Sequence, residues 1–302
     1  MKKALLIAIA KFTRKYHIRG MDRILRILYS PEFREHNYIS TVIDYDDGAK
    51  ININTSSFIE WEIFFKGIYE PHIEDYLKRA LYSGLIAVDV GANVGIHTIV
   101  MAKRVGLTGQ VFVFEPNPII FNRLLENTKL NNFTNIVPLR YALSDKHSSM
   151  ILHTFRDGLS RQGMAGFYTN VPENECVDVL VDVATFDSLV ETLNIKQVDF
   201  IKIDTEGNDF KVLRGMQKSI IYFKPEIIFE YLRDQWDYSG HTWEDALEFF
   251  ANLNYSLYTI TNKGVVPILG VVPPDSDNIL ARPETNPAQK AVLRVDSRPL
   301  AR

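Results

Sequence analysis

The chain has 302 residues, of which 46% are hydrophobic and 24% charged, which suits one large globular α/β domain with additional segments. Its net charge of −3 provides no positive field that would draw nucleic acid into a groove, so we expect no nucleic-acid partner. The single cysteine, Cys176, excludes an intramolecular disulfide and fits a reducing compartment such as the cytoplasm. The histidine and cysteine spacings give a structural zinc site no support.

The N-terminal 36 residues are basic and amphipathic. Two apolar stripes recur there at helical spacing on either side of Gly20: Leu5, Ile9 and Phe12, then Met21, Ile24, Leu25 and Leu28. The apolar run over residues 4–10 is too short to span a bilayer, and basic residues follow it at once, which argues against secretion. Such helices can lie on an anionic membrane or cap the domain with the apolar stripe inward, and we favour capping. Residues 1–60 are thus expected to form an adaptor segment.

From about residue 84, short β-rich runs alternate with helical ones, which is typical of a parallel sheet with crossovers. The strand runs are LIAVDV (85–90), QVFVFE (110–115), NIVPLRYAL (135–143), VDFIKID (198–204) and PEIIFEY (225–231). Helices are expected over 97–105, 118–131, 209–223 and 242–253, the last opened by a capping pattern between Thr242 and Asp245. The sequence therefore predicts a Rossmann-like α/β domain over residues 61–283.

Three further segments complete the prediction. The runs YSLYTIT (255–261) and GVVPILGVV (264–272) are expected to close the sheet as an antiparallel hairpin. The stretch 146–197 is too long for a simple crossover; it holds the strand-like runs SMILHT and VDVLVDV around a loop with Gly158, Gly163 and Gly166, and we interpret it as a substrate-side insertion. The proline-containing polar tail over 284–302 is expected to be flexible.

The segment IAVDVGANVGIHT (86–98) resembles the glycine-rich turn of a dinucleotide-binding fold, but it does not match the full fingerprint. A G-x-G-x-x-G pattern that starts at Gly91 needs glycines where this chain has Asn93 and Ile96. Those glycines let the backbone approach phosphates, so a ligand without phosphates would not need them. Asp89 would repel an anionic pyrophosphate and attract an ammonium or a sulfonium.

S-adenosylmethionine meets these demands, because it combines a nucleoside, a cationic sulfur and an amino-acid end without any phosphate. Gly91 and Gly95 would allow the sharp turn, and Asn93 tolerates unusual backbone angles. Glu115 follows Gly95 by twenty residues and ends the next strand, where an acid can accept both ribose hydroxyls. The pattern therefore predicts S-adenosylmethionine as the cofactor.

A set of motifs along the chain resembles the FkbM-type methyltransferases, a branch of the class I S-adenosylmethionine-dependent enzymes. The motifs are GIYEP (67–71), DVGANVG (89–95), FEPNP (114–118), ALSD (142–145), DTEGND (204–209), VLRG (212–215) and PEIIFEY (225–231). The resemblance covers about residues 67–283 and implies a seven-stranded sheet with the cofactor across the carboxyl ends of its first strands. It also implies that the 89–95 motif is the methionine-side loop, that Glu115 is the ribose acid and that Ala142 belongs to the adenine wall.

Two acids, Asp204 and Glu206, follow the strand VDFIKI on the same rim of the sheet as the cofactor loop. With a hydroxyl acceptor, Glu206 could take the proton as charge develops on oxygen, while Asp204 orients it or faces the sulfonium. Alternatively, the two acids could cap the helix that starts near Asp209. A third interpretation joins them with Glu230 in a Mg²⁺ site, which we rank below the metal-free base.

The predicted function is S-adenosylmethionine-dependent O-methylation of a hydroxyl on a sugar or glycan, a lipid-linked acceptor or a natural product; the preference for oxygen comes from the resemblance. The alternatives are an NAD-dependent oxidoreductase and a non-catalytic methyltransferase-fold protein that binds a partner or a membrane through residues 1–36. The expected location is the cytoplasm, where residues 1–36 would also allow peripheral contact with the inner face of a membrane.

Overall fold

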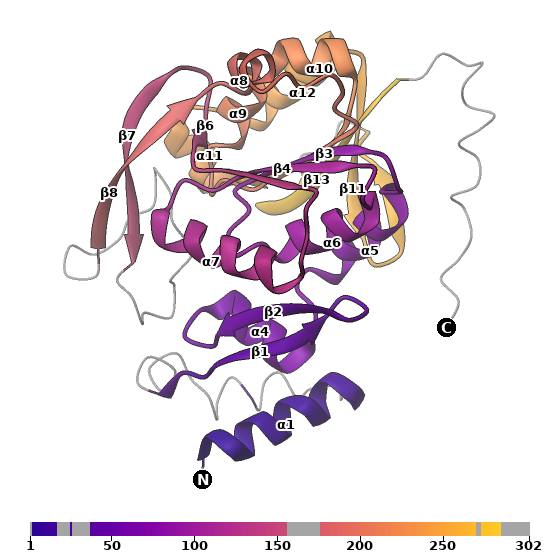
Figure 1. Cartoon of the computed structure of the whole chain (residues 1–302). Helices are drawn as coiled ribbons and strands as arrows, with labels where there is room; N and C mark the ends of the chain where they lie inside the picture. Colours follow the sequence, from indigo (N-terminus) through magenta and orange to yellow (C-terminus); the bar gives the residue numbers. More distant parts are fainter. Residues whose placement is uncertain (1, 17–24, 26–36, 156–175, 270–272, 285–302) are drawn as a thin grey trace.

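The computed structural model describes residues 2–16, 25, 37–155, 176–269 and 273–284 (Figure 1). Within them, the central sheet has the strand order β12-β11-β13-β10-β9-β3-β4-β5. Its strands are β3 (Ile86–Val90), β4 (Gln110–Phe114), β5 (Ile136–Leu139), β9 (Phe200–Ile203), β10 (Glu226–Leu232), β11 (Tyr255–Thr261), β12 (Gly264–Pro267) and β13 (Ser276–Pro283). The pairs from β5 through β10 are parallel, and β13 pairs antiparallel with both β10 and β11. The predicted open α/β sheet is confirmed, with eight strands instead of the seven that the resemblance implies, because the short edge strand β12 is added to the sheet by pairing with β11.

The order of the sheet reverses beside β3. The chain runs outward from β3 to β4 and β5 on one side, then returns to β9 and β10 on the other. In open α/β sheets, ligands bind in the crevice outside the carboxyl ends of the strands at such a switch point. The residues that follow β3, β4 and β9 therefore meet at one edge.

Helices cover both faces of the sheet (Figure 1). One face carries α5 (Pro71–Ala80), α6 (Ile96–Val105) and α7 (Pro118–Leu130), and the other carries α8 (Phe186–Thr192), α9 (Asp209–Gly215), α10 (Gln217–Phe223), α11 (Arg233–Ser239) and α12 (Trp243–Asn252). Alternate residues of β4 belong to the two separate hydrophobic cores, Val111 and Val113 to one and Phe112 and Phe114 to the other. Burial on both faces explains why these strands read as continuous apolar runs.

Strand β13 was not predicted, and it changes the end of the sheet. It lies between β10 and β11, so the predicted β11–β12 hairpin forms the edge of the sheet instead of following β10 directly. Its apolar part is only Ile279, Leu280 and Ala281, all fully buried, between polar residues such as Asp277 and Arg282. A run this short gives a weak strand signal by itself, and only the pairing with β10 and β11 supplies its stability.

Two predicted elements are interrupted. The run NIVPLRYAL forms β5 and then the two-residue strand β6 (Ala142–Leu143), which belongs to a different sheet. The single helix expected over 209–223 consists of α9 and α10. At the end of α9, a β-carbon on Gly215 would lie 1.9 Å from the carbonyl oxygen of Ser144, so this helix end packs directly on the backbone that follows β6.

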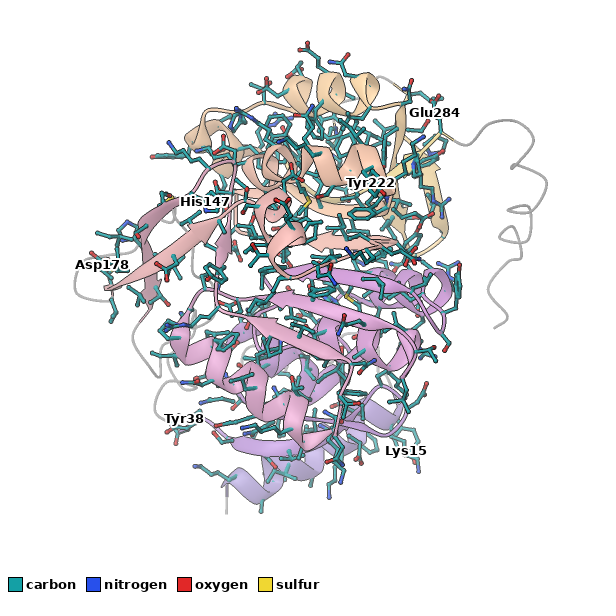
Figure 2. The ribbon with its side chains drawn as sticks, turned by 45° about the horizontal axis from the view of Figure 1, so that its top comes forward. Lys15, Tyr38, His147, Asp178, Tyr222 and Glu284 are labelled. Carbon is teal, nitrogen blue, oxygen red and sulfur yellow. The ribbon has the colours of Figure 1, made fainter. Side chains whose placement is uncertain are left out.

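The insertion forms a three-stranded sheet in the order β6-β8-β7, in which β7 (Ser148–Phe155) and β8 (Cys176–Ala184) pair antiparallel. The strand-like runs SMILHT and VDVLVDV are thus confirmed as strands, while Gly158, Gly163 and Gly166 lie outside the described residues. The β7–β8 hairpin projects from the body of the molecule (Figure 1), and Asp178 on β8 lies at its periphery (Figure 2).

The N-terminal part packs below α7. Helix α1 (Lys2–Tyr16) contacts α4 (Phe58–Lys66), and β2 (Ala49–Asn54), which pairs with β1 (Ser40–Tyr45), contacts both α4 and α7 (Figure 1). The boundary expected between residues 60 and 61 falls inside α4, and the division into domains stays a prediction.

Capping by α1 is confirmed, but the face that packs inward shares only Ile9 with the predicted stripe. Ala10 and Thr13 are buried, and the Thr13 hydroxyl donates to the carbonyl of Phe65 at 2.7 Å. Leu5 and Phe12 of the predicted stripe are 61% and 50% exposed, because the helix turns Ala10 and Thr13 toward α4. The second predicted helix, over 21–28, lies outside the described residues apart from Leu25. No helix in the described part is long and apolar enough to span a bilayer.

Candidate cofactor and catalytic site

A pocket that is partly open to solvent lies at the carboxyl ends of β3, β4 and β9. Seven of the eight predicted site residues line it: Asp89, Gly91, Asn93, Glu115, Ala142, Asp204 and Glu206. The eighth, Gly95, is the N-cap of α6 and shapes the turn from behind. The structure therefore brings together residues that are more than one hundred positions apart in the chain.

The turn after β3 depends on left-handed backbone angles. Gly91 has a φ of 76°, and a β-carbon there would lie 1.8 Å from the carbonyl oxygen of Asp204. Gly95 has a φ of 91°, and its β-carbon would lie 2.7 Å from the side chain of Leu124. Asn93 has a φ of 53°, a value that asparagine tolerates better than most residues. The glycine at 91 is thus needed both for its angle and for the contact between the two loops.

Replacing Gly91 by alanine should separate these two needs when Gly240 serves as the control. Gly240 has a φ of 82° but no atom within 4 Å of an added β-carbon, so Gly240→Ala carries only the left-handed strain of about 1 kcal/mol. Gly91→Ala must also displace the backbone at Asp204, and we expect it to lower the free energy of unfolding by about 3 kcal/mol or more. Urea unfolding of both variants measures this; equal losses would contradict the steric role of the contact.

Glu115 is held in place by the backbone. Its Oε2 accepts from the Asn93 N–H at 3.0 Å and its Oε1 accepts from the Asn117 N–H at 2.9 Å. Burial raises the pKa of Glu115 to about 7, although these two hydrogen bonds act in the opposite direction. Each carboxylate oxygen retains a lone pair for a further donor, so this acid suits a pair of neighbouring hydroxyl groups.

Asp89 is buried at the wall of the pocket, where its Oδ2 accepts from the Thr98 hydroxyl at 2.5 Å. Its Oδ1 has no hydrogen-bond partner within the described residues. Burial raises the pKa of Asp89, while Lys202, directly opposite on β9, lowers it. A buried acceptor that lacks a donor is costly, and a cationic or N–H donor from a ligand would satisfy it.

Lys202 is buried in the middle of an acidic rim. Its Nζ lies 2.9 Å from Asp204 Oδ2. Burial lowers the pKa of Lys202, but Asp204 and Asp89 outweigh that effect, so its pKa is raised and the ammonium stays charged. Burial, together with Asp204, raises the pKa of Glu206 to about 7. Burial likewise raises the pKa of Glu230, with Asp204 as the next cause.

The capping alternative for Asp204 and Glu206 is not what the structure shows. Asp204 pairs with Lys202, and Asp209 holds the turn before α9 by accepting from the Thr205 hydroxyl at 3.0 Å and the Gly207 N–H at 3.3 Å. The magnesium interpretation also gains no geometric support, because in the described part of the chain Asp204, Glu206 and Glu230 do not bring ligand oxygens within 4.8 Å of one another.

Several pocket residues were not predicted as site residues. Lys202, Tyr69 and His97 line the pocket. The His97 Nε2 lies 3.8 Å from Glu70 Oε2, and burial lowers the pKa of His97 well below its usual value. The sequence pattern could have identified Lys202 as a candidate site residue, because it is the one charged residue in the buried strand FIKI. Tyr69 and Glu70 belong to GIYEP, which the sequence identified only as a motif.

The aromatic cluster after β10 packs in the core. Tyr231, Trp236 and Trp243 are buried, while Tyr238 is 78% exposed. The first three therefore stabilise the core by packing.

The raised carboxyl pKa values predict how stability changes with pH in the cofactor-free protein. Glutamate titrates near pH 4.3 when unfolded, and Glu206 titrates at about 7 when folded. The folded state therefore holds more protons between these values, and the melting temperature should fall as the pH rises from about 5 to about 7.5. Glu206→Gln should reduce this fall, whereas Glu248→Gln, at an exposed position of α12, should leave it unchanged. Calorimetry across this range is the measurement; parallel profiles for all three proteins would contradict the burial effect.

Comparison with known proteins identifies a family model and several relatives. Residues 89–257 match the model described as "Methyltransferase FkbM domain". The chain is 30% identical over 135 residues to the hexuronic acid methyltransferase AglP of Haloferax volcanii, which covers 44% of this chain and 50% of that protein. It is 27% identical over 188 residues to Methyltransferase 1 of Beauveria bassiana, which covers 58% of this chain and 74% of that protein. The first alignment therefore spans only half of the relative.

Among solved structures, Methyltransferase FkbM from Methylobacillus flagellatus KT superimposes with a TM-score of 0.41 at 15% sequence identity. The superposition covers 87% of this chain and 60% of that one.

Proposed function

The chain belongs to the FkbM methyltransferase domain family, and from this premise we propose that it methylates a hydroxyl group on a sugar or glycan, a lipid-linked acceptor or a natural product. The predicted family, the predicted enzyme class of S-adenosylmethionine-dependent methyltransferases and the predicted cofactor are confirmed by this membership. It also decides against the NAD-dependent oxidoreductase that the sequence left as an alternative. The acceptor and the roles of individual residues are our proposals.

S-adenosylmethionine fits the pocket by the chemistry of its walls. We assign the two ribose hydroxyls to Glu115, whose carboxylate is already oriented by two backbone N–H groups. The methionine end belongs at the turn of Gly91, beside the unsatisfied Oδ1 of Asp89. Ala142 and Tyr141 provide an apolar wall for the adenine ring. When bound, S-adenosylmethionine supplies a methyl group on a cationic sulfur.

Glu206 carries the proposed catalytic step, and the observation that supports it most is its position on the pocket rim with a pKa of about 7. A carboxylate with such a pKa can take a proton from a hydroxyl near neutral pH as the oxygen forms its bond to carbon. Asp204 lies next to it but is paired with Lys202, so it is suited to orienting rather than accepting. Alignment of the hydroxyl with the methyl group would contribute several kcal/mol more.

Glu206→Gln tests this role. We expect turnover to fall at least about tenfold, while the affinity for S-adenosylhomocysteine changes by no more than a few fold. Because only the ionised carboxylate accepts a proton, wild-type kcat/KM should rise with pH through about 7 and then level off. The variant should lose that rise, and Glu248→Gln should behave as the wild type. Unchanged turnover in Glu206→Gln would remove this residue from the mechanism.

The charge of the pocket favours a neutral acceptor. Asp204, Glu206 and Glu230 line the pocket, and Lys202 in the same wall is already paired with Asp204. An acceptor carboxylate would meet these groups at close range, which is unfavourable in a partly buried site. The name of the Haloferax relative, in contrast, gives an acidic sugar, hexuronic acid, as its acceptor.

Incubating the full chain with methyl-labelled cofactor tests both points. Matched neutral glycosides and uronic acid glycosides should be offered separately, together with glycan, lipid and small-molecule fractions. We expect label to appear on hydroxyl oxygen, with a preference for the neutral member of each pair. Label on carboxylate oxygen or on nitrogen alone would contradict the proposed O-methylation of a hydroxyl.

Peripheral membrane contact through residues 1–36 stays a prediction. On α1, Leu5, Phe12 and Tyr16 are exposed and recur at helical spacing. Lys11 and Lys15 lie beside them and are exposed as well. This combination suits an anionic surface, and it is the part of the N-terminal helix that α4 leaves uncovered.

A further inference from the structure

The outer face of the β7–β8 hairpin carries three potential metal ligands. In the antiparallel register, His153 is opposite Asp178 and Phe155 is opposite Cys176. Because side chains alternate along a strand, His153, Cys176 and Asp178 project from the same face of the hairpin. The opposite face carries Leu152, Val181 and Val183, which form a small buried core. The three polar groups are therefore not needed for packing the hairpin.

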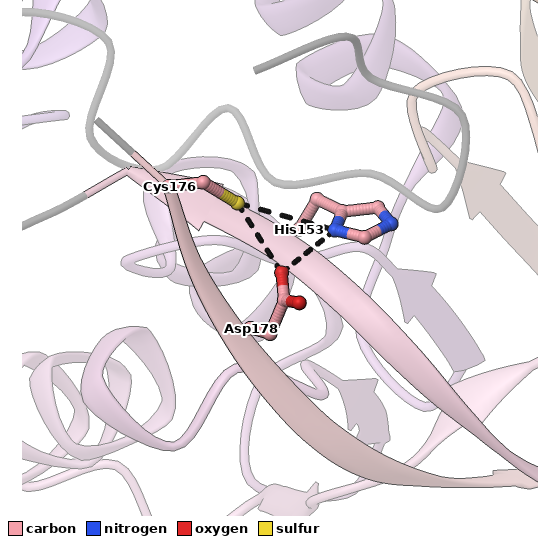
Figure 3. A group of neighbouring side chains, drawn as sticks. All are labelled: His153, Cys176 and Asp178. Carbon is pink, nitrogen blue, oxygen red and sulfur yellow. Dashed lines mark hydrogen bonds and ion pairs between the residues drawn. The ribbon is translucent and has the colours of Figure 1, made fainter. Parts of the chain in front are cut away.

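Their ligand atoms converge on one point (Figure 3). His153 Nδ1 lies 2.8 Å from Asp178 Oδ1, and Cys176 Sγ lies 3.2 Å from the same oxygen. Cys176 Sγ and His153 Nδ1 are 3.9 Å apart. Among the described residues, this is the group in which three such side chains bring ligand atoms within 4.8 Å of one another.

The arrangement differs from a nucleophilic cysteine site. In a Cys–His–Asp triad, the thiol and the carboxylate use opposite nitrogens of the imidazole ring, so that the proton passes through it. Here the thiol and the carboxylate both face Nδ1. Three donors that share one centre are what a metal ion requires, and proton transfer across the ring is not possible in this geometry.

We propose that His153, Cys176 and Asp178 form a binding site for a divalent metal ion of the zinc class. Zinc–ligand bonds of about 2.0–2.3 Å in a tetrahedron separate ligand atoms by roughly 3.3–3.6 Å. The observed separations of 2.8, 3.2 and 3.9 Å lie within about half an ångström of that range. A thiolate and a carboxylate would balance the charge of the ion, and the half-exposed position leaves a fourth coordination site for water.

The site would tie β7 to β8 at the end of their ladder, next to the cofactor pocket. The hydroxyl oxygen of Thr154, adjacent to His153, accepts from Asn117 Nδ2 at 3.2 Å, and the backbone N–H of Asn117 donates to Glu115. Leu152, on the other side of His153, lines the pocket. A metal ion that fixes His153 therefore stiffens the strand that forms one wall of the pocket, without touching the proposed reacting groups.

Cobalt(II) titration of the reduced full-length chain tests the site, because a cobalt–thiolate bond gives a near-ultraviolet charge-transfer band and tetrahedral cobalt gives strong visible bands. We expect one equivalent to bind with both features, and zinc to displace it. Cys176→Ser should abolish the charge-transfer band, and His153→Gln should weaken binding at least about tenfold. The matched control is His147→Gln, since His147 is an exposed histidine at the start of the same hairpin, outside the cluster (Figure 2).

Two results would overturn the proposal: wild-type protein without the thiolate band, or His147→Gln weakening cobalt binding as much as His153→Gln. Zinc should also raise the melting temperature of the wild type and of His147→Gln, and leave that of Cys176→Ser unchanged. The binding readout needs neither cofactor nor acceptor, so its failure would leave the proposed methyl transfer standing. Conversely, loss of turnover in Glu206→Gln leaves the cobalt spectrum as it is.

Discussion

The site depends on the ion pair between Lys202 and the carboxylates around it. Lys202 is only 2% exposed, on a strand in the centre of the sheet, with its ammonium 2.9 Å from Asp204 and in register with Asp89. Isolated buried charges are unfavourable by several kcal/mol, so neither the ammonium nor the carboxylates would remain ionised alone. The pair thus keeps Asp204 in place beside Glu206, while the burial of Glu206 raises its pKa toward neutrality.

A steric constraint couples the two halves of the site. The loop after β3 and the loop after β9 touch where Gly91 meets the carbonyl of Asp204, in a space that no β-carbon can enter. The walls assigned to the cofactor and the acids assigned to catalysis therefore share one backbone contact. Near-attack alignment demands such rigidity, because displacements of about 1 Å already slow a transfer reaction substantially.

The hairpin of β7 and β8 provides a second place where the wall of the pocket can be made rigid. Its inner face contributes Leu152 to the pocket, while its outer face gathers the proposed metal ligands. The strand is thus in contact with the cofactor region on one side and open to an ion from solvent on the other. A bound ion would act on the pocket through the stiffness of β7 alone.

Local patterns in the chain were sufficient for the central strands, for most of the helices and for the glycine-containing turn after β3. Asp89 lies near the carboxyl end of β3, Gly91 and Asn93 follow β3, and Glu115 follows β4. In a parallel sheet all carboxyl ends meet at one edge, so the proximity of these residues follows from order alone. The capping box of α12 and the β11–β12 hairpin were also predictable, because each is formed by residues that are close together in the sequence.

Features that depend on contacts between residues far apart in the chain could not be predicted from local sequence patterns. Strand β13 has too short an apolar run to be recognised without β10 and β11 beside it. Lys202 becomes a site residue only because the fold places Asp89 next to it. His153 and Cys176 are separated by 22 intervening positions and follow no ligand spacing, so their convergence rests on the register of β7 against β8. Register and long-range packing are determined by contacts across the whole domain, so a local stretch of sequence does not specify them.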